Sequence, residues 1–214
     1  MLIDMHNHTT VSSECSRMSP EELIEAALKS PLDAICVTEH SSLEGAEVAL
    51  EIGRRMNFPV FRGIEARTDL GDMLVFGWYE DIPDGFPLDE LCPMILSSGG
   101  AIFAAHPYHL RGGWNLYSAL RLEGFDLDAD WDRIEILKKL TGIEVVNGNV
   151  ASETNERARA LAFKLGINGI GGSDAHSTSM VGKAATRFKG EITSEADLIR
   201  LLRHGAYEAV RLRY

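Results

Sequence analysis

The chain lacks the long apolar segments and paired cysteines that mark membrane and secreted proteins. No apolar run approaches the roughly 20 residues needed to span a bilayer, and residues 1–4 (MLID) carry no basic segment followed by a long apolar one. Its three cysteines, Cys15, Cys36 and Cys92, are far apart and odd in number. This indicates reduced thiols and not a disulfide framework. We therefore expect a cytoplasmic protein with no signal peptide and no membrane contact.

Positive charge is also scarce. The chain has 21 Lys and Arg against 32 Asp and Glu, a formal net charge of −11. Broad nucleic-acid binding depends on neutralising phosphates with basic side chains, so this balance argues against it. A glycine-rich phosphate loop of the Walker type is absent too, which argues against nucleotide-driven chemistry. A small anionic substrate is compatible with this negative net charge, because cations bound in a site can dominate the electrostatic field there.

Short apolar runs alternate with helical patterns along all 214 residues. This alternation predicts an α/β fold. The length suffices for one full core, and no linker or low-complexity stretch interrupts it, so we expect a single domain over residues 1–214. The expected strands begin at residue 2 and cover 34–38, 60–64, 74–78, 101–105, 143–146 and 167–170. Five helices are expected. One follows Ser19 as its N-cap, one has Ser152 as its N-cap, and the others cover residues 43–56, 88–98 and 194–204.

About seven strands separated by helices favour a distorted TIM-like (β/α)7 barrel with parallel strands. The segment 108–133 is long for a βα connection, and it is either a functional loop or a surface excursion with a short helix. The terminal segment 207–214 resembles a strand. Whether it closes the barrel or pairs with another chain stays open.

Histidine and carboxylate side chains follow several of these strands directly. His6 and His8 are two residues apart, so on a strand they point to the same side. Asp174 and His176 repeat the spacing after two glycines that allow a tight turn. The ends of three further strands carry His40, Glu65 and His106. Mixed imidazole and carboxylate ligands suit Zn, Mn or Fe and not Ca. The pattern predicts a metal site at the C-terminal ends of the strands.

The order of these segments resembles the polymerase and histidinol phosphatase (PHP) superfamily of metal-dependent phosphoesterases. The matching blocks are Asp4-Met5-His6-Asn7-His8-Thr9-Thr10, Thr38-Glu39-His40, Gly63-Ile64-Glu65, Ala105-His106-Pro107 and Gly172-Ser173-Asp174-Ala175-His176. The resemblance implies a site for two or three divalent metal ions (Mn, Zn or Fe) that activate a hydroxide. It implies two ligand sets that share a bridging Glu65: His6, His8, Glu65 and Asp174, and His40, Glu65, His106 and His176.

The chain departs from the family pattern at several positions. A family ligand usually follows His-x-His by five or six residues, where this chain has Ser13 and Glu14, and Glu14 is the expected ligand. The strand after Glu65 has no histidine, so either Asp72 replaces it or one ion is absent or weakly held. Glu39 stands at the position of a usual Asp. We expect Glu39, and Asp4 on the strand of His6, to orient ligands, with direct metal binding as the alternative.

Three residues are candidates for substrate binding. Arg111 can bind a phosphate as a planar fork, and His109 can act as proton donor. Arg17 can bind the far side of a substrate. For each, an ordinary solvated position in a loop is the alternative.

The expected function is hydrolysis of a phosphomonoester or small nucleotide phosphoester, with a small phosphorylated molecule as the partner. One alternative is a metal-dependent hydrolase of a C–N or C–O bond, since related barrels use similar ligands. Another is a non-catalytic PHP binding module for a partner protein. The first predicts metal-dependent phosphate release, the second metal dependence without phosphate, and the third weak metal retention without turnover. The oligomeric state is left open.

Overall fold

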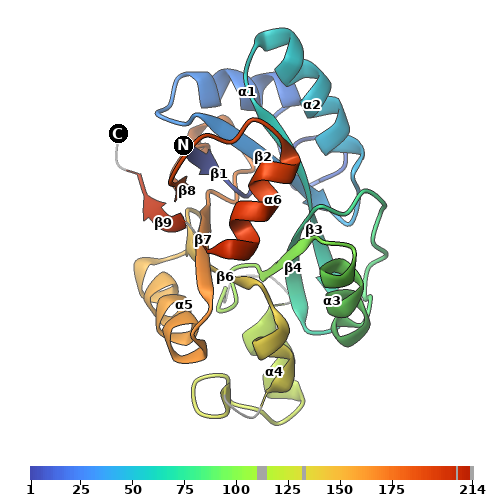
Figure 1. The fold of residues 1–214 in the computed structure, drawn as a ribbon, viewed down its shortest axis with the longest axis vertical. Helices are drawn as coiled ribbons and strands as arrows, with labels where there is room; N and C mark the ends of the chain where they lie inside the picture. Colours follow the sequence, from blue (N-terminus) through green and yellow to red (C-terminus); the bar gives the residue numbers. More distant parts are fainter. Residues whose placement is uncertain (110–114, 132–133, 206, 213–214) are drawn as a thin grey trace.

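The computed structural model describes residues 1–109, 115–131, 134–205 and 207–212. Within them, one mixed sheet of nine strands curls into a nearly closed barrel with helices packed around it (Figure 1). The strand order is β7-β6-β5-β4-β3-β2-β1-β8-β9. The strands are β1 (Leu2–Asp4), β2 (Ala34–His40), β3 (Val60–Thr68), β4 (Gly71–Phe76), β5 (Ala101–Ala104), β6 (Gly142–Asn147), β7 (Asn168–Gly172), β8 (Ala184–Phe188) and β9 (Tyr207–Arg211).

The α/β barrel prediction is confirmed, although its strands are not all parallel. Strands β1–β2–β3 and β5–β6–β7 pair in parallel. Strand β4 is antiparallel to β3 and β5, and β8 is antiparallel to β1 and β9. Only Asp69 and Leu70 connect β3 to β4. So short a connection makes a hairpin, because a parallel neighbour requires a long crossover. The terminal segment forms a strand as expected, β9, and its pairing, which the sequence left open, is within the chain against β8. Strand β8 itself was not predicted.

The described helices surround the sheet as expected from the apolar stripes. They are α1 (Pro20–Leu28), α2 (Glu44–Met56), α3 (Leu88–Ser97), α4 (Leu116–Leu122), α5 (Ser152–Leu165) and α6 (Glu195–His204), with short 3₁₀ turns at Glu135–Lys139 and Thr178–Met180. The predicted start of α1 is confirmed, since Ser19 and Glu22 form a reciprocal capping box. The predicted cap of α5 is wrong. Ala151 is the N-cap and makes no side-chain bond, and Ser152 is already helical.

The core has two parts, one on each face of the sheet. Alternate residues of β2 belong to each: Ile35 and Val37 to the cluster that includes residues of α1, α2, α3 and α5, and Ala34 and Cys36 to the cluster that includes residues of α6. Helix α6 crosses the barrel in Figure 1 and contributes Leu202 to the second part. The helices thus cover the outside and one end of the barrel.

The long segment after β5 is anchored on α5. The buried Tyr108 donates its hydroxyl to Asp128 at 2.7 Å. Arg157 of α5 binds the same carboxylate at 2.7 Å and lies 4.1 Å from the centre of the Tyr108 ring. The segment carries the short helix α4, as one sequence-based alternative proposed.

A threonine side chain closes the gap between β7 and β8. The Thr186 hydroxyl accepts from the Gly171 N–H at 2.8 Å and donates to the Gly171 carbonyl at 3.1 Å, and the site is fully buried. We expect Thr186→Val to lower the free energy of unfolding by about 1–3 kcal/mol, because both backbone groups lose this partner. Urea denaturation checks this, with the exposed Thr178→Val as the matched control. Equal stability of Thr186→Val and wild type would contradict this assignment.

An ion pair ties β3 to the start of α6. The Arg62 guanidinium binds Glu195 at 2.9 and 2.8 Å, and the Arg62 N–H donates to the same carboxylate at 3.0 Å. Burial alone would raise the pKa of Glu195, but these bonds outweigh it and the pKa is lowered. The stabilisation is therefore present above the ordinary glutamate pKa and disappears as the pH falls through the lowered one.

We expect Glu195→Gln to cost about 1–3 kcal/mol at neutral pH and progressively less below about pH 4. Denaturation curves of both proteins across this range measure the difference. A difference that stays constant down to about pH 2.5 would exclude the ionised pair as its cause.

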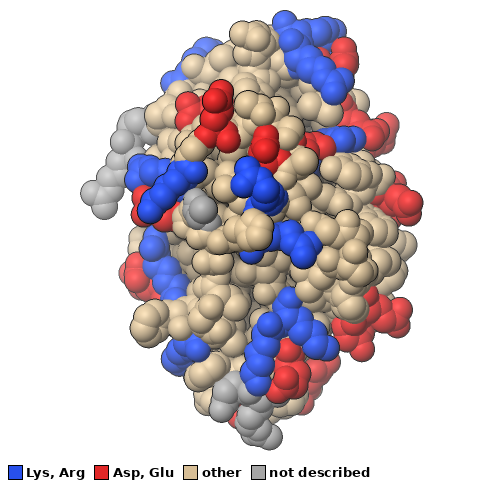
Figure 2. Space-filling model, in the orientation of Figure 1, with Lys and Arg blue, Asp and Glu red and all other residues tan. Residues whose placement is uncertain are grey.

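Charged side chains of both signs are interspersed on the face shown in Figure 2. Among the described residues, no helix is both long enough and apolar enough to span a membrane. The cysteines are unpaired, with Cys15 exposed and Cys36 and Cys92 buried.

Candidate metal centre

The ligands predicted from the sequence converge at one end of the barrel. His6 and His8 follow β1, His40 ends β2 and Glu65 lies on β3. The loops after β5 and β7 bring His106, Asp174 and His176. Because strand ends of a barrel meet at one rim, residues more than 160 positions apart in sequence become neighbours, such as His6 and Asp174, whose Nε2 and Oδ1 atoms are 3.7 Å apart.

Glu65 is the centre of this group. Its Oε1 atom lies 2.8 Å from His106 Nε2 and 3.4 Å from His6 Nε2. Its Oε2 atom lies 3.0 Å from His40 Nδ1 and 3.3 Å from His8 Nε2. One buried carboxylate therefore faces four imidazoles, two on each oxygen. This is the arrangement expected of a carboxylate that bridges two cations.

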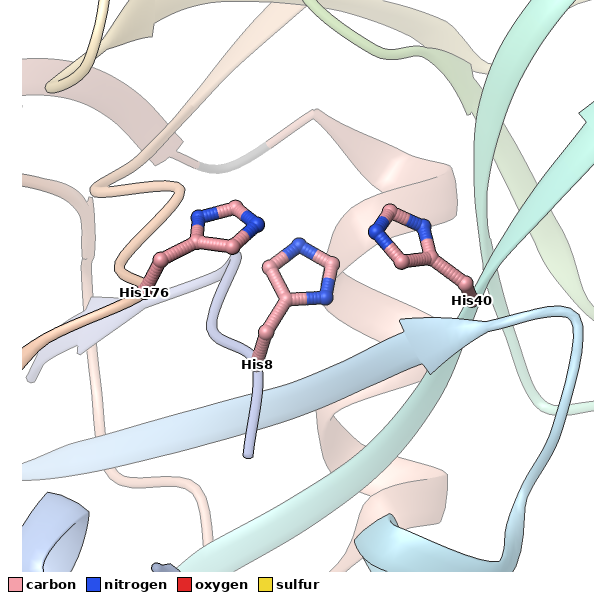
Figure 3. A group of neighbouring side chains, drawn as sticks. All are labelled: His8, His40 and His176. Carbon is pink, nitrogen blue, oxygen red and sulfur yellow. The ribbon is translucent and has the colours of Figure 1, made fainter. Parts of the chain in front are cut away.

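Three imidazoles form one face of the cluster (Figure 3). His8 lies in the middle, with ring centroids 4.5 Å from both His40 and His176. One nitrogen from each ring lies within 4.8 Å of the others. The three rings come from three segments, after β1, at the end of β2 and after β7. They can hold one cation between them.

Asp174 joins His6 and His8 in a second group whose donor atoms lie within 4.8 Å. The backbone of Asp174 is left-handed, with φ of +52°. Its Oδ2 atom accepts from the amides of Asn147 and Asn149 at 3.3 and 3.4 Å. Its Oδ1 atom is left toward the imidazoles, 3.5 Å from His8 Nε2. A third group consists of His6, Glu65 and His106.

The buried carboxylates favour positive charge on His6 and His106, whereas burial lowers the pKa of His8 to about 4. Burial would lower the pKa of His6, but the Glu144 and Glu65 carboxylates outweigh it and raise the pKa well above its usual range. The pKa of His106 is raised to about 9 against burial, chiefly through its bond to Glu65. Burial would raise the pKa of Glu65, yet His6 and His106 hold it well below its usual range. The carboxylates thus stabilise protons on these imidazoles, and a divalent cation can take the place of those protons.

The donor set fits such cations. The Nε2 atoms of His6 and His8 approach to 3.0 Å, so two ring nitrogens face each other with carboxylate oxygens around them. Neutral imidazole and carboxylate are the ligands of Zn, Mn and Fe. The buried His, Asp and Glu groups are therefore consistent with a multinuclear metal site.

Glu144, in the middle of β6, is a candidate site residue that the sequence analysis missed. It is fully buried, and it accepts from His6 Nδ1 at 3.1 Å and from the His106 N–H at 2.9 Å. Its bond fixes the Nδ1 proton of His6 and leaves Nε2 free as a ligand. Asn147 donates to the same carboxylate at 3.0 Å. The sequence signal was a lone carboxylate inside the apolar run Ile143-Glu144-Val145-Val146.

Two further predicted carboxylates hold loops in place. Asp4 accepts the backbone N–H groups of Ser173 at 2.7 Å and Gly182 at 3.0 Å, and burial chiefly raises its pKa to about 6. Glu39 accepts from the Thr9 N–H at 3.0 Å and from the hydroxyl of Ser13. Ser13 also lies 3.2 Å from His8 Nδ1, so Glu39 orients that ring through it.

Two local expectations were wrong. The glycine pair before Ser173 has no positive φ; instead, a Cβ on Gly172 would lie 2.4 Å from the Cβ of His6. Glycine is needed there for close approach and not for a turn. His106 was expected to be extended before Pro107, but its φ is +23°. The chain turns there, because the His109 N–H donates to the His106 carbonyl at 2.9 Å.

The remaining predicted site residues lie at the edge of the ligand cluster or outside it. Glu14 is exposed and outside the ligand groups of the described chain, and Arg17 is also exposed. Asp72 is buried on β4, 3.7 Å from Arg67, and burial and Glu65 raise its pKa to about 6. His109 packs edge-on to His106, with ring centroids 5.4 Å apart. Arg111 lies outside the described residues.

A pocket of about 650 Å³ opens beside the cluster, where His40 forms part of its wall. Glu14, Arg67 and Asp84 also line it. A larger pocket of about 910 Å³ lies at the opposite end of the parallel strands, near Met1 and Pro59. The smaller pocket is the one that adjoins the imidazoles.

The comparisons with known proteins agree with this architecture. A model of the PHP domain matches residues 4–157, and a PHP-associated model matches residues 152–207. An uncharacterised protein of Methanocaldococcus jannaschii is 30% identical over 191 residues, covering 88% of this chain and 70% of that protein.

Two solved structures share the fold. One from Bifidobacterium adolescentis, described as a proposed metal-dependent phosphoesterase, has a TM-score of 0.63 at 17% identity and covers 95% of this chain and 96% of that one. An amidohydrolase from Chromobacterium violaceum has a TM-score of 0.63 at 15% identity, with 98% and 97% covered. Since the PHP domain match spans well over half of the sequence, the chain belongs to the PHP domain family.

Proposed function

We propose that this protein is a metal-dependent phosphoesterase that hydrolyses a phosphomonoester or a small nucleotide phosphoester. The observation that carries the proposal is Glu65, whose two carboxylate oxygens face His6 and His106 on one side and His8 and His40 on the other. Such an arrangement suits two cations held close together, and a pair of cations can stabilise both the attacking and the leaving oxygen of an in-line phosphoryl displacement.

The chain's own residues prepare this site in three ways. Glu144 and Ser13 contact the Nδ1 atoms of His6 and His8, so the Nε2 atoms of both rings point into the cluster. Full burial of both rings excludes bulk water from their surroundings. Divalent cations bound there would lower the pKa of water and would offset charge on the phosphoryl oxygens.

The pocket beside His40 supports a small substrate. Its volume of about 650 Å³ lies in the range of small-molecule sites. Arg67 lines it, 3.7 Å from Asp84, and supplies a guanidinium next to the cluster. The net charge of −11 and the mixed charges in Figure 2 favour a small molecule over a nucleic-acid polymer. The native metal is proposed to be Mn, Zn or Fe.

The test is release of inorganic phosphate from a panel of nucleotides and phosphorylated metabolites by the Mn²⁺-loaded protein. A chelated sample and His8→Ala are measured beside it. His204→Asn, an exposed histidine at the end of α6, is the matched control. We expect phosphate release that disappears on chelation and in His8→Ala and persists in His204→Asn.

Other outcomes would overturn the proposal. Metal-dependent cleavage of amides without phosphate release would assign a C–N hydrolase. Weak metal retention together with no turnover would assign a binding module.

A further inference from the structure

A fourth group of donor atoms lies beside the three described above. It consists of His106, His109 and Asp174, and one ligand atom from each lies within 4.8 Å of the other two. His106 and Asp174 also belong to the other groups, whereas His109 appears only in this one. The sequence analysis assigned His109 to the substrate.

The backbone holds His109 in place beside His106. The His109 N–H donates to the His106 carbonyl at 2.9 Å, and the Asn115 side chain donates to the His109 carbonyl at 2.5 Å. The Tyr117 N–H donates to the Pro107 carbonyl at 3.0 Å. The ring planes of His106 and His109 make an angle of 70°. This turn therefore presents His106 and His109 to the cluster from the same loop after β5.

One ring nitrogen of His106 has no hydrogen-bond partner among the described residues. The Nε2 atom of His106 contacts Glu65 at 2.8 Å, and the other nitrogen, Nδ1, is buried. A buried unpaired ring nitrogen requires an explanation, because leaving it unmet costs about 1–3 kcal/mol. Coordination of a cation by His106 supplies one.

We propose that His106, His109 and Asp174 hold an additional divalent cation at the rim of the metal centre. This inference rests on the proposed metal centre and adds a ligand to it. Two imidazoles and one carboxylate suit Fe, Mn or Zn and leave coordination positions open to water or a substrate oxygen. His109 is half-buried, and its two partner ligands are shared with other groups. The rim cation is therefore the most weakly held of the set.

The test counts cations without using turnover. Metal-free wild type, His109→Asn and the control His204→Asn are titrated with Mn²⁺, and bound metal per chain is measured by elemental analysis and native mass spectrometry. Wild type and His204→Asn are expected to bind one more cation per chain than His109→Asn. That last cation is expected to bind at least about tenfold more weakly than the others. Thermal denaturation of the metal-free proteins verifies that His109→Asn folds.

The outcomes separate this inference from the proposed function. Equal numbers and affinities in wild type and His109→Asn would overturn the rim site and return His109 to a substrate role. Phosphate release lost in His109→Asn with metal content unchanged would do the same. If no variant and no wild-type sample binds Mn²⁺, the metal centre itself is refuted.

Discussion

Replacing Glu65 with glutamine is expected to lower metal-dependent phosphate release by about 100-fold or more. The carboxylate contacts four imidazoles through two oxygens, the shortest contact being 2.8 Å to His106 Nε2. A glutamine amide keeps one acceptor oxygen and places an N–H donor where the second stood. It therefore fails to bridge, and bound cations are lost together with activity.

Steady-state kinetics and metal content per chain measure both effects in Glu65→Gln. The matched control is Glu208→Gln, an exposed carboxylate on β9 that pairs with Arg187. Near wild-type values are expected in the control. Full activity of Glu65→Gln with all cations retained would show that this residue does not bridge.

Replacing Glu144 with glutamine is expected to weaken metal binding by about 10–100-fold, a smaller effect than that at Glu65. Glu144 accepts from His6 Nδ1 at 3.1 Å and from the His106 N–H at 2.9 Å. Glutamine reproduces the shape of Glu144 but removes the negative charge that keeps the proton of His6 on Nδ1. The ligands remain, so binding weakens without being abolished.

Competition of Glu144→Gln with a chelator for Zn²⁺ gives this affinity directly. Glu153→Gln, on the exposed surface of α5, has the same change of charge away from the cluster. Unchanged affinity in Glu144→Gln would mean that the orientation of His6 is set without the carboxylate.

Much of the site could be predicted because its residues lie at or near the C-terminal ends of apolar strands. His6, His40 and Glu65 were placed by the rule that a strand presents side chains at its C-terminal end. Their convergence needed only the α/β alternation, and the structure confirms that alternation. The capping box of Ser19 was similarly local, since its partners are three residues apart.

What escaped prediction depends on contacts distant in sequence. Glu144 contacts the Nδ1 atom of His6 from 138 positions away, and the residues around Glu144 in the sequence do not indicate that contact. The direction of β4 depends on a short hairpin that apolar periodicity does not reveal. Glu14 was expected in the cluster by resemblance, yet its neighbour Ser13 turns inward to Glu39 and His8 while Glu14 stays exposed. Its role as a ligand stays a prediction.

The most direct measurement is phosphate release by the chelated protein during stepwise return of Mn²⁺, with bound metal determined at each step. If the cluster around Glu65 is a multinuclear phosphoesterase centre, activity returns only as a second cation binds per chain. Full activity in the metal-free protein, or no phosphate release from any substrate at full occupancy, would contradict that account.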